Sequence, residues 1–340
     1  MQHPPLLRNR LVRGLGATTA ALALAAGLTA CGGDAKATGT TPGSDKVTIG
    51  AVSNGAAQQA ELSVPVVESL RAQLPKAVRD SGELVIGVGA LPAGFPPLAY
   101  VGTDQKTITG AEPDLGRLVA ATLGLKPVVK NSTWENLFVG IDSGRVDVAF
   151  SNVTVTEERK KKYDFASYRQ DNLAFEALKE NTWEFGGDYR NLAGRTVSVS
   201  KGTNQEKILL EWQKKLQSEG KDITVKYFPD ANSVYLALSG KKIDLNFGPN
   251  PSIAYHITQT ASGNAPTRKA GSFSGAGETL QGLIAATVKK NSGLAEPVAQ
   301  AVNHLAGSGR YAQLLTAWHL SDEAVTTSRV NPPGLPTTNS

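Results

Sequence analysis

Residues Val146–Glu157, VDVAFSNVTVTE, indicate the fold class, because an apolar strand pattern is followed here directly by a helix-start signal. Val146–Ser151 has the short, largely apolar composition of a buried strand. Thr154–Glu157 (TVTE) then fits the capping box, in which a hydroxyl and a carboxyl three residues later satisfy free amides at a helix start. The stretch therefore predicts a strand followed by a helix, the unit from which α/β sheets are built.

The same junction recurs on both sides of this stretch, at Ser132–Glu135 and Thr203–Glu206. The expected strands are Leu84–Val88, Pro127–Lys130, Val146–Ser151, Thr196–Ser200, Thr224–Phe228, Ile243–Phe247 and Leu283–Val288. The expected helices between them include Asp114–Leu123, Trp134–Ser143, Gln205–Gln217 and Ser233–Ser239, and a helical pattern at Leu70–Val78 precedes the first strand. This alternation predicts an α/β fold of parallel βαβ units with helices on both faces of the sheet.

The three junctions also indicate where a ligand binds. In open α/β sheets such junctions lie at the carboxyl ends of the strands, where ligands are held. A capping box mostly serves only to start a helix, so a single one does not mark a site. Three of them around one cleft favour a site whose helix starts offer amides and positive dipole character.

Residues 1–30 have the pattern of a secretory signal. Arg8, Arg10 and Arg13 precede the apolar run Ala17–Leu28, which is short for the span of about 20 apolar residues that a membrane-crossing helix needs. The run ends at Leu28–Cys31 (LTAC), which resembles the lipobox of bacterial lipoproteins. The resemblance implies a cleaved lipoprotein signal peptide, lipidation of Cys31 with chains such as palmitate, and an extracytoplasmic protein anchored to the cell membrane.

Composition bounds the remaining possibilities. The chain has 340 residues, enough for about two domains. Its formal charge of +5 falls to +2 without the three leader arginines, which is too little to argue for nucleic acid. One cysteine excludes an internal disulfide and a cysteine-built metal cluster, and no metal-ligand spacing occurs, so neither a metal nor a cofactor is expected.

The segments outside the α/β body differ in composition. Residues 31–64 are rich in small and polar residues and are expected to be a flexible tether. Residues 65–82 are expected to be an N-terminal helical extension. Residues 323–340, which contain Pro332, Pro333 and Pro336, are expected to be a disordered tail.

Several motifs resemble the polar amino-acid substrate-binding proteins of ABC importers, the bacterial extracellular solute-binding proteins of family 3. The strongest match is Ser151–Arg159 followed by Asp164-Phe165, which is similar to the family's S.(S/T).T.ER….DF segment. The other matches are Gly110–Leu115, Trp134–Leu137, Gly144–Val148 and Lys201–Gln205, and the resemblance covers about Leu84–Leu320.

The resemblance implies a two-lobed periplasmic-binding-protein-like (type II) fold. Each lobe is a mostly parallel sheet flanked by helices, and two hinge crossovers join the lobes. Lobe one would be 83–172 plus 281–322 and lobe two 173–280, with hinges near 169–173 and 271–282. The implied function is capture of a small polar solute, an amino acid or related carboxylate, by closure of the lobes. The implied partners are a membrane permease and its ATPase, for a protein that is itself a monomer.

The resemblance also implies a ligand site. Arg159 matches the guanidinium that grips the ligand carboxylate, a pairing that suits bidentate hydrogen bonds. Phe95 and Trp134 match the aromatic walls. The full set of ligand-binding residues is Phe95, Trp134, Ser151, Asn152, Thr154, Arg159, Thr203, Asn204, Gln205 and Asn250. Without the resemblance, Arg159 reads as a solvated charge and the two aromatics as core residues.

The chain departs from the family where the ligand ammonium is bound. Pro249 stands where the family usually has an acid, with Asn250 beside it, and Pro92 replaces a second common acid. A buried cation needs a partner, so either Glu112 or Asn250 compensates or the ligand lacks a primary amine.

Two other functions remain open. Some relatives in this family are cyclohexadienyl-dehydratase-like enzymes on the same fold, and a ligand-sensing lipoprotein is a third possibility. His256, His304 and His319 are not set in a Ser-His-Asp pattern, and Gly87-Val88-Gly89 lacks the later glycine of a dinucleotide-binding loop. The sequence therefore favours a binding protein over an enzyme.

Overall fold

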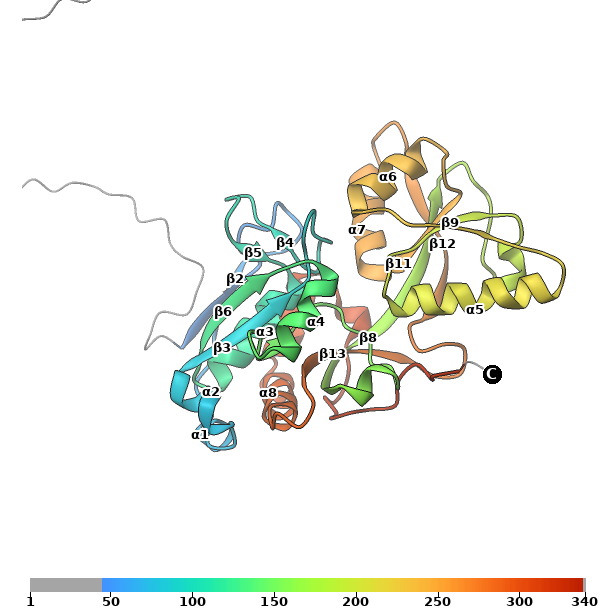
Figure 1. Ribbon diagram of the computed structural model, residues 1–340. Coiled ribbons are helices and arrows are strands. Elements are labelled where there is room, and N and C mark those ends of the chain that lie inside the picture. Colours follow the sequence, from blue (N-terminus) through green and yellow to red (C-terminus); the bar gives the residue numbers. More distant parts are fainter. Residues whose placement is uncertain (1–44, 339–340) are drawn as a thin grey trace, which may run out of the picture. The chain divides into compact units, whose positions relative to one another are not determined.

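Figure 1 shows the computed structural model, which describes residues 45–338. The helices are α1 Glu68–Arg71, α2 Lys76–Ser81, α3 Ala111–Thr122, α4 Trp134–Asp142, α5 Asn204–Ser218, α6 Ala231–Ser239, α7 Asn250–Thr260, α8 Ala295–Gly307 and α9 Arg310–Ala317, with 3-10 turns η1 Arg159–Lys161, η2 Tyr189–Leu192 and η3 Ser321–Glu323. The strands are β1 Lys46–Ile49, β2 Ala60–Ser63, β3 Glu83–Val88, β4 Tyr100–Val101, β5 Ile108–Thr109, β6 Lys126–Asn131, β7 Val148–Ala149, β8 Tyr163–Leu178, β9 Thr196–Ser198, β10 Thr224–Lys226, β11 Leu245–Pro249, β12 Thr267–Ser274 and β13 Gly282–Lys289.

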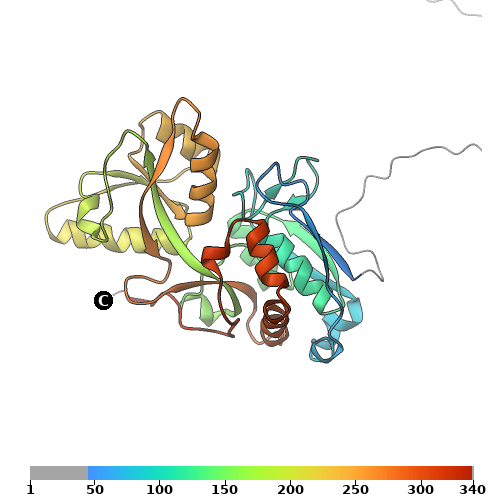
Figure 2. The same ribbon diagram turned by 180° about the vertical axis from the view of Figure 1, so that it is seen from behind.

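The long strand β8 is the centre of a nine-stranded sheet with the order β10-β9-β11-β8-β13-β7-β3-β6, and β12 also pairs with β8. The first part of β8, from Tyr163 to Asp171, pairs antiparallel with β13. Its second part, from Asn172 to Leu178, pairs antiparallel with β11 and β12. The outer pairs β3–β6, β3–β7, β9–β10 and β9–β11 are parallel. One strand thus runs from one half of the sheet into the other (Figures 1 and 2).

Each half of the sheet has its own core. The largest cluster of buried apolar side chains joins β3 to α3 and α8, and Leu84, Ile86 and Leu118 in it are fully buried. A second large cluster joins the far part of β8 to α5 and contains Phe175 and Trp212. Apolar packing is thus concentrated within each half of the sheet, on either side of the point where β8 changes its pairing partners.

Gly110 fixes the start of α3. Its φ of +132° lies in a region that side chains rarely adopt, and a Cβ there would lie 2.1 Å from the carbonyl oxygen of Leu98. Only glycine allows the chain to turn here from β5 into the helix.

The tether prediction is wrong for its described part, residues 45–64. Strands β1 and β2 form an antiparallel hairpin there, and Val47, Ile49, Leu62 and Val64 are buried in the largest core cluster. These apolar residues alternate with polar ones, the pattern of a half-buried strand, which the small-residue composition of the segment obscured.

The prediction of a disordered tail over 323–340 is also wrong for its described part. Glu323 is buried, Leu335 is fully buried, and the backbone of Val330 and of Leu335 forms bridges with Ala166 and Thr156. The prolines prevent regular strand pairing but not packing, because isolated bridges need only some of the backbone amides.

The helix expected after Thr154 does not form. Thr154 forms a bridge with Ile284, and only the short turn η1 follows; the Thr156 hydroxyl accepts a hydrogen bond from the Arg159 amide at 3.0 Å. The other two junctions do start helices. Thr203 caps α5, and Thr133, rather than Ser132, caps α4.

The predicted signal peptide, Cys31 and residues 31–44 of the predicted tether lie outside the described residues. Among residues 45–338, no helix has the length and apolar character needed to cross a membrane.

Candidate functional site

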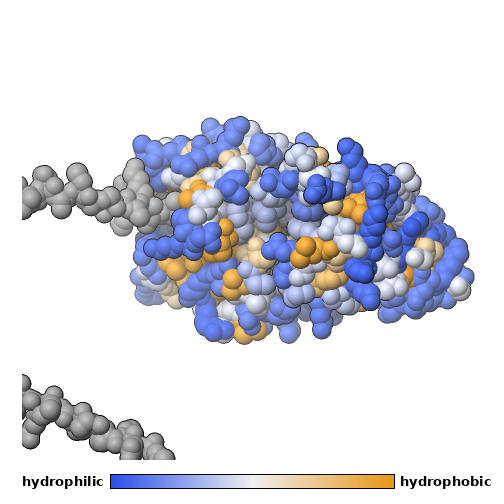
Figure 3. Space-filling view, turned by 90° about the horizontal axis from the view of Figure 1, so that it is seen from above, coloured by the Kyte–Doolittle hydropathy of each residue, from blue (hydrophilic) through white to orange (hydrophobic). Residues whose placement is uncertain are grey.

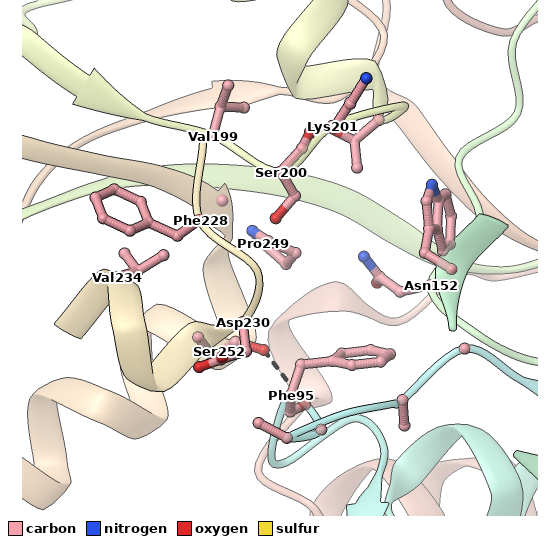
Figure 4. A pocket seen from close by; sticks show the side chains of 18 of the residues that line it. Phe95, Asn152, Val199, Ser200, Lys201, Phe228, Asp230, Val234, Pro249 and Ser252 are labelled. Atoms are coloured by element: carbon pink, nitrogen blue, oxygen red, sulfur yellow. Dashed lines mark hydrogen bonds between the residues drawn. The ribbon is translucent and has the colours of Figure 1, made fainter. Parts of the chain in front are cut away.

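A cavity of about 470 Å³ lies where the carboxyl ends of β3, β9 and β11 meet the starts of α4, α5, α6 and α7. Its wall alternates apolar groups, such as Leu91 and Val234, with polar groups, such as Ser200 and Ser252. Figure 4 shows Phe95 and Asn152 on the side of the cavity opposite Phe228 and Val234. A concave site of this size, mostly apolar with a few placed polar groups, suits a small organic ligand.

Seven of the ten residues expected to bind ligand line this cavity. They are Phe95, Trp134, Ser151, Asn152, Thr203, Asn204 and Gln205. Thr154, Arg159 and Asn250 are not among the lining residues. The structure therefore brings together the aromatic walls and the polar groups at two strand ends.

A close backbone approach at Gly89 and a left-handed backbone conformation at Asn152 bring Ser151 and Asn152 to the cavity wall. Ser151 is fully buried, and its hydroxyl accepts a hydrogen bond from the Gly89 amide at 2.8 Å. A Cβ at Gly89 would lie 3.3 Å from the backbone of Trp134, so glycine allows this close approach. Asn152 has φ +53°, a left-handed conformation that asparagine tolerates, and its side-chain oxygen accepts a hydrogen bond from Arg169.

Arg159 holds two backbone carbonyls instead of facing the cavity. Its Nη1 donates to the carbonyl of Thr154 at 3.0 Å and its Nη2 to that of Gly202 at 3.1 Å. The guanidinium also lies 5.4 Å from the ring centre of Trp134, whose Nε1 donates to the same Gly202 carbonyl at 3.3 Å. Burial lowers the pKa of Arg159 to about 10, and the charge of Asp171 opposes this shift, so the side chain is cationic at neutral pH.

Asp171, which the sequence did not single out, links two of the expected ligand residues. Its Oδ2 accepts hydrogen bonds from the Thr154 hydroxyl at 2.7 Å and the Asn204 amide at 3.0 Å. A Cβ at Gly275 would lie 1.7 Å from the same oxygen, so this position needs glycine. Burial raises the pKa of Asp171 to about 6, against the lowering effect of the Thr154 hydrogen bond. The strand that carries Asp171, β8, is not among the strands expected from the sequence, and a single aspartate matches no motif. The sequence therefore contains no signal for Asp171.

Neither of the two residues expected to compensate for the missing acid lines the cavity. Glu112 is buried and pairs with Arg169 at 2.9 Å. Arg169 also pairs with Glu323, and the Asn250 amide donates to the same Glu323 carboxyl at 3.3 Å. Both residues are therefore engaged in a buried ion-pair cluster outside the cavity wall.

The carboxyl groups that do line the cavity are those of Glu135 and Asp230. Asp230 is half-buried and caps α6, where its Oδ1 accepts a hydrogen bond from the Ser233 amide at 2.9 Å. Pro249, at the position of the missing acid, also lines the wall (Figure 4). Asp230 precedes the helical pattern expected at Ser233–Ser239, and aspartate is a preferred N-cap residue. This is the sequence signal that could have placed Asp230 at a helix start.

A further carboxylate, that of Glu176, lies behind the cavity wall. Asn246 lines the cavity, and its Nδ2 donates to the fully buried Glu176 at 3.2 Å. Glu176 also contacts His256, whose ring stacks on the cavity-lining Tyr235 at 3.5 Å. His256 is therefore a partner of a buried acid on α7.

Figure 3 shows the face seen from above, on which apolar residues form several separate patches among polar ones. Exposed apolar side chains on the described surface include Leu91, at the cavity, and Leu236 of α6. No group of three or more side chains that would suit a metal ion occurs among residues 45–338.

Comparison with known proteins gives consistent matches. A family model for bacterial extracellular solute-binding proteins, family 3, matches residues 86–321. The L-cystine-binding protein TcyJ of Escherichia coli (strain K12) is 32% identical over 170 residues, 49% of this chain and 59% of that protein. The arginine-binding protein ArgT of Corynebacterium glutamicum is 25% identical over 268 residues, 78% of this chain and 83% of that protein.

A solved structure of an ancestral arginine-binding protein bound to arginine is 25% identical, with a TM-score of 0.59. The similarity covers 70% of this chain and 98% of that one. The expected fold class, a two-lobed type II binding-protein fold with two crossovers, is confirmed.

Proposed function

Because the chain belongs to the bacterial extracellular solute-binding proteins of family 3, we propose that it captures a small polar solute for an ABC importer. The solute is an amino acid or a related carboxylate, and the partners are a membrane permease and its ATPase. The observation that carries this proposal is the cavity of about 470 Å³, whose wall combines Phe95 and Trp134 with hydroxyl and amide groups from two strand ends.

In this proposal, lobe one consists of residues 83–172 and 281–322, and lobe two consists of residues 173–280. Chain crossings near 169–173 and 271–282 serve as hinges, so that the ligand is trapped when the lobes close. Support comes from β8, which changes its pairing partners between Asp171 and Asn172, and from the separate core on each side of that point.

The ligand carboxylate would be held by Ser151 and Asn152 on one side and by Thr203, Asn204 and Gln205 at the start of α5 on the other. The start of α5 adds free amides and the positive end of its dipole. Arg159, which lies against Trp134, contributes its charge from behind this wall. Thr154 acts through Asp171, which also holds Asn204 in place.

The ammonium group of an amino-acid ligand would pair with Asp230. This carboxyl is half-buried at the wall, and each of its oxygens has room for a further hydrogen bond besides those from Ser233. Asn250 would contribute indirectly, through the hydrogen bond that its amide donates to Glu323.

The family assignment places the protein outside the cytoplasm. The LTAC sequence that ends at Cys31 supports the further proposal of a lipid anchor on the cell membrane, with the protein acting as a monomer. A sensing role would use the same cavity and differ only in the membrane partner.

The test is a panel of common amino acids, L-cystine and simple carboxylates added to the purified protein while its melting temperature is recorded. A bound ligand raises the melting temperature by mass action, and we expect at least one amino acid to do so. Arg159→Ala should weaken that binding indirectly, by up to about 3 kcal/mol, the scale of hydrogen bonds to a charged group, because the guanidinium holds the Gly202 carbonyl and lies against Trp134.

If no compound in the panel raises the melting temperature, the transport proposal loses its basis. Recovery of a chemically altered ligand would favour the dehydratase-like alternative over capture and release.

A further inference from the structure

The last described residues, 328–338, form a strap that contacts both lobes. We call this segment the C-terminal strap. Its path begins beside α8, where the Ser328 amide donates to Asn303 Oδ1 at 2.8 Å and Asn303 Nδ2 donates back to the Ser328 carbonyl at 3.1 Å.

The first part of the strap pairs with lobe one. The Ser167 amide donates to the carbonyl of Arg329 at 3.0 Å, and the Arg329 amide donates to the Ser167 hydroxyl at 2.9 Å. Asn331 then exchanges two hydrogen bonds of 2.9 Å with the backbone of Phe165. These contacts fix the strap to the first part of β8.

The middle of the strap lies against the segment between Thr154 and Arg159. The Leu335 amide donates to the carbonyl of Val155 at 3.0 Å, and the Glu157 amide donates to that of Leu335 at 2.9 Å. Gly334 allows this approach, because a Cβ there would lie 2.3 Å from the Val155 carbonyl oxygen. The strap therefore braces the backbone that carries the expected carboxylate residues.

The end of the strap is attached to lobe two. The Leu335 side chain is fully buried in the lobe-two core cluster, together with Leu209 and Trp212 of α5. Lys207 of α5 donates to the carbonyls of Pro336 and Thr337, the latter at 2.9 Å. One short segment is thus hydrogen-bonded to lobe one and packed into the core of lobe two.

We propose that the C-terminal strap is a third connection between the lobes and that it restrains their hinge motion. The inference rests on the proposed closure of the two lobes. Two crossovers alone leave a hinge free to bend over a range of angles, whereas a third attachment away from them limits that range. If the lobes separate, either the Leu335 side chain leaves its pocket or the backbone pairing at Val155 breaks. The restraint keeps more of the ligand-free population in the binding-competent arrangement and so sets the apparent affinity.

The experiment measures the distance between the lobes in the full-length chain carrying Cys31→Ser, with spin labels at Lys106→Cys in lobe one and Lys242→Cys in lobe two. Both positions are exposed. Leu335→Ser removes the buried anchor and Lys207→Ala removes the second attachment without emptying a core position. Val330→Ser is the matched control, because Val330 lies in the same strap with 36% of its surface exposed.

We expect a broader distance distribution in the ligand-free protein for Leu335→Ser and Lys207→Ala, and no change for Val330→Ser. With L-arginine and L-cystine as probes, whichever binds the parent should bind both strap variants about three- to tenfold more weakly, in proportion to the competent fraction lost. The distance measurement needs no ligand, so failure of the proposed function leaves this arm intact.

Hydrogen exchange of the β11 amides reports whether lobe two is still folded. The proposal is overturned if Lys207→Ala leaves the distribution unchanged and Leu335→Ser alters it only together with loss of amide protection in β11. In that case the tail is simply part of the lobe-two core.

Discussion

At the residue scale, Pro249 and Asp230 both line the cavity, and Asp230 is the proposed partner of a ligand ammonium group. Proline offers no charge, while Asp230 comes from a different element, the cap of α6. An acid at a helix cap is held in place by the helix amides, so it presents its remaining lone pairs in a constant direction. On this proposal, the cap of α6 supplies the acid that the sequence lacks at Pro249.

Asp230→Asn should weaken binding of an amine-bearing ligand by about tenfold or more, the scale of a hydrogen bond to a charged group. Isothermal titration with the ligand found in the panel measures this change. Glu135→Gln is the matched control, since Glu135 also lines the cavity but is exposed. If both variants lose the same amount of affinity, the effect comes from the lower negative charge around the cavity and not from a specific contact with Asp230.

Which residues lie at the cavity could be predicted from the sequence better than which groups those residues bind. Ser151, Asn152 and Thr203 lie at the cavity as expected, because each follows a strand whose end is visible in the sequence. Thr154 and Arg159 share that local signal, but their hydrogen bonds go to Asp171 and to the Gly202 carbonyl. Such partners come from distant parts of the chain, so no local pattern reveals them.

At the element scale, β8 is the decisive strand. It carries Arg169 and Asp171 at the point where its pairing passes from β13 to β11 and β12. A buried carboxyl at this point is bound by Thr154 on one side and Asn204 on the other. The strand therefore couples the two halves of the sheet through side chains as well as through its backbone.

Asp171 makes a pH-dependent contribution to stability. Burial raises the pKa of Asp171 from 3.8 to about 6, so the folded protein keeps a proton that the unfolded chain has already released between these pH values. Its contribution is fully present below pH 4 and falls by up to about 3 kcal/mol as the pH rises through 6.

Asp171→Asn should remove this slope. Urea unfolding gives the free energy of unfolding of the parent and of the variant at each pH from 4 to 7. The difference between the two free energies should change across this range. Asp322→Asn, at an exposed carboxyl, is the control and should run parallel to the parent. A constant difference between Asp171→Asn and the parent would show that Asp171 does not titrate in this range.

Elements with strong local periodicity were predictable, and elements that depend on partners were not. The helical patterns at Trp134 and Gln205 appear as α4 and α5 within a residue or two. The expected helix after Thr154 is absent, because Val155 and Glu157 pair with the C-terminal strap and Thr154 with β13. Strand pairing from a distant segment overrides a local capping signal here.

At the scale of the whole molecule, the proposed lipid anchor at Cys31 would hold the two lobes at the membrane surface. Cys31 is the single cysteine of the chain, so it is the one possible site of thioether lipidation. Metabolic labelling with a radioactive fatty acid should mark the parent protein and not Cys31→Ser. Immunoblotting for equal expression is the control, and label that persists in the variant would refute the lipobox interpretation.

The family, the α/β alternation and the strand ends that line the cavity could be predicted from the sequence, because they depend on residues close together in the chain. Long-range contacts were needed to show that residues 46–63 form a hairpin, that Leu335 packs in the core of lobe two, and that Arg159 and Thr154 bind other protein groups. The physical reason is the same in each case. A short segment without its own periodicity acquires structure only from the surface that it buries, and that surface is assembled from residues far away in the sequence.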